Sequence, residues 1–260
     1  MDLATSRTAR FLLDHWQNGT RAAAIPEAFR PRTREAAYAA AAAIGKISGD
    51  TVAGWKIAAT SVAGQKHINV EGPLAGRIYA SKLVAPGSSV AISRNNMKVA
   101  EAEFAFSFAQ DLAPRGYDYT RDEVVAAVDH LRLSLEVPDS RFEDFTKVGA
   151  EQLIADTACA CWLSLGDHVA ADWRALDLAA HPVTASRNGA EAGRGSGGNV
   201  LGDPLVALTW LVNEAARYCG GVKAGQFVTT GTCVPPVAIQ LGDRVDMDFG
   251  VLGTIGLGFT

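Results

Sequence analysis

The chain has 260 residues, of which 48% are hydrophobic and 20% charged, and its formal net charge is −4. This composition is typical of a soluble globular protein and excludes the disordered, collagen-like and coiled-coil classes. Lys and Arg do not cluster as nucleic-acid phosphates require, and the apolar stretches are too short to span a bilayer. We therefore expect a cytoplasmic protein that binds neither nucleic acid nor membrane.

The first fifth of the chain is expected to be helical. One helix ends at Gly19, and Thr33 is suited to cap an Ala-rich helix that reaches Ile44. From Thr51 onward, short Gly-punctuated segments rich in Val, Ile and Thr predict strands, such as residues 52–57.

This change of pattern divides the chain into two parts. We expect a helical N-terminal segment over residues 1–50 and a mixed α+β catalytic domain over residues 51–260.

Residues 100–108 alternate strictly and predict a two-faced strand. Phe104 lies on the face expected to join the core, whereas Glu101 and Glu103 lie on the other. Two neighbouring carboxylates on one face are explained either by solvation or by a bound ion.

A helix is predicted after Thr120, which forms a capping box with Glu123. Apolar residues at three- or four-residue steps extend this prediction to Leu135, so that the helix delivers the chain to Glu136. Apolar neighbours flank Glu136, and a lone buried carboxylate is expensive. A hard divalent cation, Mg²⁺ or Mn²⁺, would stabilise all three glutamates, because such ions prefer oxygen ligands.

The remaining chain predicts a loop, a helix and a curved sheet. Residues 187–202 are rich in Gly and are expected to form a mobile loop, either a solvent-exposed connection or a lid. Asp203 caps a helix that ends at Gly220. Short strands separated by Gly or Pro follow and favour a roll: residues 228–230, 237–240, 244–249 and 254–257.

Several dispersed segments resemble the 2-keto-4-pentenoate hydratase and 2-oxo-3-hexenedioate decarboxylase group of the fumarylacetoacetate hydrolase superfamily. They are Gly54-Trp-Lys-Ile-Ala-Ala-Thr-Ser61, Ala100-Glu-Ala-Glu-Phe104, Leu135-Glu-Val-Pro-Asp-Ser-Arg141, Ile154-Ala-Asp156, Leu201-Gly-Asp-Pro204 with Trp210-Leu211, and Gly242-Asp243 before Asp248-Phe-Gly250.

The resemblance implies the superfamily's mixed β roll with a helical N-terminal segment. It also implies that Glu101, Glu103 and Glu136 bind Mg²⁺ or Mn²⁺ and that Lys56 is catalytic. Because Lys56 has apolar neighbours, we expect its pKa to fall toward neutrality.

The same resemblance implies substrate contacts, which we expect at Ser61, Asp139, Arg141 and Cys159. Arg194, in the Gly-rich segment, is a further candidate that would bind a distal carboxylate.

The sequence also departs from the group's pattern. Leu74 stands where many hydratases carry an acid, which leaves Glu71 or a water for acid/base work at that point. Cys159 replaces a common serine.

The function implied is that of a lyase of aromatic catabolism, a hydratase that adds water to a small 2-hydroxy-2,4-dienoate or 2-oxoenoate. The alternatives are 2-oxo-3-hexenedioate (4-oxalocrotonate) decarboxylase, an acylpyruvate-type C–C hydrolase, and a non-catalytic metal-binding partner of a neighbouring pathway enzyme. The resemblance further implies a homo-oligomer.

Overall fold

The computed structural model describes residues 2–260, which form six α-helices and thirteen strands among short 3-10 turns. The helices are α1 (Leu3–Asn18), α2 (Arg34–Ser48), α3 (Val62–His67), α4 (Arg121–Ala127), α5 (Ala150–Ala155) and α6 (Pro204–Tyr218). The strands are β1 (Val52–Ala58), β2 (Leu74–Tyr79), β3 (Leu83–Val84), β4 (Ser89–Val90), β5 (Val99–Phe108), β6 (Val128–Val137), β7 (Trp162–His168), β8 (Pro182–Arg187), β9 (Ala190–Ser196), β10 (Phe227–Thr229), β11 (Val237–Ala238), β12 (Arg244–Asp248) and β13 (Thr254–Phe259). The expected α+β class is confirmed.

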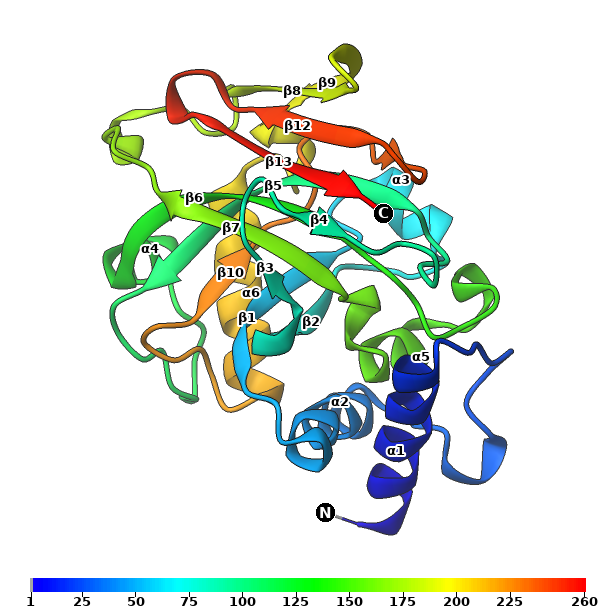
Figure 1. Cartoon of the computed structure of the whole chain (residues 1–260). Helices are drawn as coiled ribbons and strands as arrows, with labels where there is room; N and C mark the ends of the chain where they lie inside the picture. The colour runs from blue at the N-terminus through cyan, green and yellow to red at the C-terminus, as the bar shows by residue number, and fades with distance from the viewer. Residues whose placement is uncertain (1) are drawn as a thin grey trace.

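Two mixed sheets build the molecule. The large sheet has the order β2-β1-β10-β5-β6-β7-β3, with β11 paired to β5, and the small sheet has the order β4-β13-β12-β8-β9. Figure 1 shows the small sheet at one end of the molecule and α1, α2 and α5 gathered at the other. Among residues 2–260, every helix is too short or too polar to cross a membrane.

The N-terminal helices form for the reasons expected. Gly19 ends α1 in a left-handed conformation with φ 66°, and the Thr33 hydroxyl accepts the Ala36 N–H to begin α2. However, α2 continues through Gly45 to Ser48, four residues beyond the predicted end at Ile44. The Tyr79 hydroxyl bridges this part of the helix, because it accepts the Gly45 N–H at 3.1 Å and donates to the Ala41 carbonyl at 2.8 Å.

The predicted helix up to Leu135 is wrong beyond Ala127. Only residues 121–127 are helical, and β6 begins at Val128. The apolar residues Leu131, Leu133 and Leu135 also alternate with a period of two, and β6 lies between β5 and β7, which satisfy its backbone groups on both sides. Sheet pairing therefore prevailed over a helical pattern that fitted the same residues.

The Gly-rich segment is not a loop. Residues 182–196 form the hairpin β8–β9, which turns at Asn188 and Gly189 and pairs through β8 with β12. Glycine is required where the strand passes other backbone, because a Cβ at Gly195 would lie 2.0 Å from the Cys233 carbonyl oxygen. The prediction of a mobile loop is therefore wrong.

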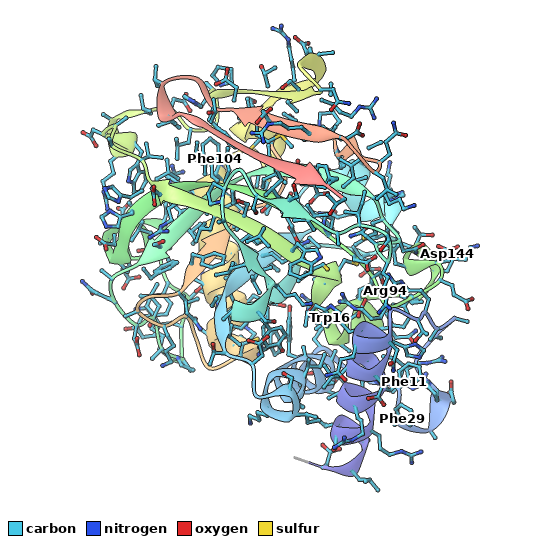
Figure 2. All side chains as sticks on the ribbon, viewed as in Figure 1. Phe11, Trp16, Phe29, Arg94, Phe104 and Asp144 are labelled. Carbon is cyan, nitrogen blue, oxygen red and sulfur yellow. The ribbon has the colours of Figure 1, made fainter. Side chains whose placement is uncertain are left out.

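A single large core joins the helices and both sheets. Phe104 of β5 is fully buried and lies between the sheets, where its ring meets Phe249 edge-on at 5.2 Å (Figure 2). This face of β5 is apolar as predicted, so its opposite face carries the glutamates.

Candidate active site

Three glutamates meet on adjacent strands of the large sheet. Glu101 and Glu103 lie on the same face of β5, and Glu136 on β6 stands directly opposite Glu101. One carboxylate oxygen from each lies within 4.8 Å of the others. The structure thus brings together the three residues predicted to bind metal.

Two members of this cluster are removed from water, and Glu101 is partly exposed. Glu103 and Glu136 are fully buried. The Glu103 Oε2 accepts the Gly231 N–H at 3.0 Å, but Glu103 Oε1 and both Glu136 oxygens have no hydrogen-bond partner among residues 2–260. Buried carboxylate oxygens without donors are costly, and a divalent cation with oxygen ligands would satisfy them. The residues present therefore fit Mg²⁺.

Burial controls the ionisation of the cluster. Loss of water raises the pKa of Glu101 to about 7, with Lys56 opposing this rise and Glu103 adding to it. Burial also raises the pKa of Glu103 and of Glu136.

Lys56 of β1 completes the charged group. Its side chain is buried, and its Nζ lies 3.3 Å from Glu136 Oε1. Burial lowers the pKa of Lys56, but the charges of Glu136 and Glu101 raise it by a larger amount, so the net shift of this pKa is upward. The expected fall toward neutrality is therefore wrong, because the carboxylates outweigh the desolvation, and Lys56 is an ammonium at neutral pH.

A strained turn borders Lys56. Thr157, Ala158 and Cys159 all have left-handed backbones, with φ of 52°, 51° and 63°, at a cost of roughly 1–2 kcal/mol for each L-residue. The turn packs against β1 and β2, and a Cβ at Gly76 would lie 2.1 Å from the Thr157 carbonyl oxygen.

Cys159 is the residue of this turn that was expected to contact substrate. Its side chain is buried, which raises the pKa of its thiol to about 12. Cys159 lies near enough to Lys56 for the ammonium to oppose that rise. Its contact with substrate stays a prediction.

The structure gives Arg141 a role other than the expected substrate contact. All five N–H groups of its buried guanidinium are engaged by the protein: Nε with Asp156 Oδ1, Nη1 with the carbonyls of Asp139 and Ala160, and Nη2 with the Asp156 carbonyl and Thr157 Oγ1. No N–H donor is left for a substrate carboxylate.

Asp139 is likewise committed to the protein. Its carboxylate accepts hydrogen bonds from Arg21 Nη2 and from the Asn96 N–H, each at a distance below 3 Å. Both bonds tie the segment after β6 to neighbouring loops.

Three other candidates lie at the surface. Ser61 caps α3 by accepting the Gly64 N–H at 3.0 Å, and Glu71 is exposed in the connection before β2. Arg194 is exposed on β9, where its guanidinium pairs with Glu191. Their roles as catalytic or substrate-binding residues stay predictions.

Sequence reasoning missed Gly231 and Gly76. Gly231 has φ 100° and directs its N–H to Glu103, and Gly76 is the strand partner of Lys56. No sequence pattern indicates that Gly231 contacts Glu103 or that Gly76 pairs with Lys56, because each contact joins two different segments of the chain. Leu74, which stands where an acid was expected, is fully buried beside Ala58.

Comparison with known proteins identifies the family. The model described as fumarylacetoacetate (FAA) hydrolase C-terminal matches residues 56–258. The chain is 34% identical over 218 residues to the 2-hydroxyhexa-2,4-dienoate hydratase of Comamonas testosteroni, covering 83% of this chain and 81% of that protein. It is 31% identical over 211 residues to the 4-oxalocrotonate decarboxylase of Pseudomonas putida, covering 81% and 78%.

A solved structure agrees with these relatives. The 4-oxalocrotonate decarboxylase from Pseudomonas putida G7, complexed with magnesium and adipate, superposes with a TM-score of 0.88 at 27% identity and covers 98% of this chain and 97% of that one. The expected roll of the fumarylacetoacetate hydrolase type is therefore confirmed. The chain belongs to the fumarylacetoacetate hydrolase family, in the group of the 2-keto-4-pentenoate hydratases and 4-oxalocrotonate decarboxylases.

Proposed function

We propose that the protein is a Mg²⁺-dependent hydratase, a lyase that adds water to a small 2-hydroxy-2,4-dienoate from aromatic catabolism and yields a 4-hydroxy-2-oxo acid. The observation that carries this proposal is the cluster of Glu101, Glu103 and Glu136 with the Lys56 ammonium beside it. The 34% identity to a 2-hydroxyhexa-2,4-dienoate hydratase supports the choice of substrate.

The three glutamates would hold the metal, and Lys56 would move protons. Mg²⁺ held there would supply a Lewis acid that polarises the carbonyl of a 2-oxo acid. As the 2-hydroxyl gives its proton to a water, the Lys56 ammonium supplies one to C5 and forms the 2-oxo-3-enoate. The Lys56 amine then takes a proton from the attacking water, whose hydroxyl bonds to C4. C3 receives the proton that the 2-hydroxyl released, so Lys56 ends as the ammonium again.

The pairing of Arg141 and Arg194 with other residues of the protein favours a substrate without a charged group at its far end. A dicarboxylate such as 2-oxo-3-hexenedioate needs a cation for its distal carboxylate. Arg141 has all its N–H donors engaged, and Arg194 is paired with Glu191 at the surface. Arg194, which the sequence offered for this purpose, and Arg141, the other arginine expected to contact substrate, are thus both occupied, and we therefore rank hydration above decarboxylation.

The test is turnover of freshly generated 2-hydroxypenta-2,4-dienoate with Mg²⁺, followed by loss of dienol absorbance and by the mass of the product. We expect a product heavier by one water. Lys56→Ala should lower kcat by about 10²–10⁴-fold. Lys46→Ala, which removes an exposed lysine on α2, should leave kcat unchanged.

Each alternative has its own product. Release of CO₂ from 2-oxohex-3-enedioate would indicate the decarboxylase, and two acids from an acylpyruvate would indicate the hydrolase. Mg²⁺ binding without turnover of any of these substrates would indicate a non-catalytic partner.

We also expect a homo-oligomer, which light scattering on the purified protein checks.

A further inference from the structure

A buried ion pair encloses the strained turn beside Lys56. Asp156, directly before the turn, is fully buried, and its carboxylate accepts the Ser140 hydroxyl at 2.9 Å and the Arg141 N–H at 3.0 Å. The Arg141 side chain pairs with the same carboxylate. We call Arg141 and Asp156 the clamp.

The clamp holds backbone on both sides of the left-handed residues. From one guanidinium, Nη2 donates to the Asp156 carbonyl before the turn and Nη1 donates to the Ala160 carbonyl after it, the latter at 3.1 Å. A second brace comes from the Asp139 N–H, which donates to the Cys159 carbonyl at 2.9 Å. Three consecutive L-residues do not keep a left-handed conformation by themselves. Such strain persists only where contacts with the surrounding structure compensate for its cost.

The clamp also connects two of the strands that carry the charged site, β6 with Glu136 and β1 with Lys56. Arg141 follows four residues after β6, the strand of Glu136, and the Trp16 ring covers its guanidinium at 4.2 Å. Trp16 is labelled at the end of α1 in Figure 2. On its other side, the turn presses on Gly76, the strand partner of Lys56. Glu136 and Lys56 are therefore linked through a turn that the clamp holds on both sides.

We propose that Arg141 and Asp156 are positioning residues, which hold the left-handed turn against β2 so that Lys56 stays beside Glu136. This inference rests on the proposed function for its kinetic consequence. In this proposal the clamp touches neither substrate nor metal. It fixes the turn that packs against β2, the strand paired with that of Lys56, and so keeps the site preorganised.

The first test is Arg141→Lys, which keeps the positive charge but cannot reach carbonyls on both sides of the turn. We expect kcat for 2-hydroxypenta-2,4-dienoate to fall about 10–100-fold because Lys56 is misplaced, whereas KM and the Mg²⁺-dependent rise in Tm stay close to wild type. A merely packing role would lower Tm without this separation of kcat from KM.

The second test is rescue by glycine. Ala158→Gly removes the cost of the left-handed conformation at φ 51°, so the turn needs the clamp less. Added to Arg141→Lys, it should recover most of the lost kcat. Lys98→Gly is the matched control, because Lys98 is exposed, has φ 48° and lies outside the turn. It should raise Tm without recovering kcat.

A third measurement needs no substrate. Cys159 is 5% exposed in the turn and Cys233 is 0% exposed elsewhere. With iodoacetamide and peptide mass mapping, we expect Cys159 to be alkylated faster in Arg141→Lys and protected again in the double variant, while Cys233 stays protected throughout.

The outcomes separate the clamp from the proposed function. If the wild type turns over no substrate, the proposed function fails, and the Cys159 alkylation series alone decides on the clamp. Wild-type kcat and alkylation in a folded Arg141→Lys would overturn the clamp, as would equal rescue by Lys98→Gly. If Arg141→Lys does not fold, Thr157→Val replaces it, because it removes only the Nη2 contact at 3.3 Å, and unchanged Cys159 alkylation there would overturn the clamp.

Discussion

At the scale of single residues, Glu101 links metal binding to pH. Burial raises its pKa from the ordinary 4.5 to about 7, so the folded chain keeps a proton that the unfolded chain has lost. The metal-free protein should therefore lose stability as pH rises from about 4.5 to about 7. Mg²⁺ must displace this proton, so its affinity should fall about tenfold per pH unit below 7.

Calorimetric titration with Mg²⁺ between pH 5.5 and 8 measures this dependence. Glu103→Gln keeps an oxygen for the Gly231 N–H and removes one charge, so this variant should bind Mg²⁺ weakly at every pH. Equal Mg²⁺ affinity of the wild type at pH 5.5 and 8 would contradict the prediction.

At the scale of elements, the close contact between β2 and the strained turn explains Gly76. A Cβ there would lie 2.1 Å from the Thr157 carbonyl oxygen, so Gly76→Ala must push β2 away from the turn. We expect a loss of about 1–3 kcal/mol in the free energy of unfolding, together with a lower kcat, because β2 pairs with the strand of Lys56.

Urea unfolding and steady-state kinetics check this prediction. Gly72→Ala is the matched control, since among residues 2–260 no atom lies within 4 Å of an added Cβ at that position. If Gly72→Ala and Gly76→Ala lower stability equally, the contact with the turn does not explain the glycine.

At the scale of the whole molecule, one apolar core includes residues of α1, α2 and both sheets. We therefore expect residues 1–50 to unfold together with the rest in a single transition. Replacing Phe104, which is buried between the sheets, by alanine should lower the free energy of unfolding by about 3–5 kcal/mol.

Circular dichroism and tryptophan fluorescence should follow superimposable urea curves, because Trp16 reports on α1 and Trp162 on β7. Phe104→Ala should move both curves to lower urea by the same amount. An early fluorescence transition from the N-terminal helices would show that they fold independently.

Local patterns in the sequence were sufficient to predict several features. Strict alternation over residues 100–108 predicted β5 and the shared face of Glu101 and Glu103, and the caps at Thr33 and Asp203 predicted the beginnings of α2 and α6. These signals are local because side-chain period and capping involve residues only a few positions apart. The family followed from motifs in the right order.

Other features depend on residues that are distant in the chain and follow from the fold. The segment from Val128 to Leu135 fits both a helix and a strand, and pairing with β5 and β7 selected the strand. The pKa of Lys56 rises rather than falls, because Glu136 from another strand lies 3.3 Å away. Arg141 is occupied by the turn at residues 157–159, which no sequence spacing reveals. Electrostatics and packing act through space, so their outcome depends on contacts that chain order does not contain.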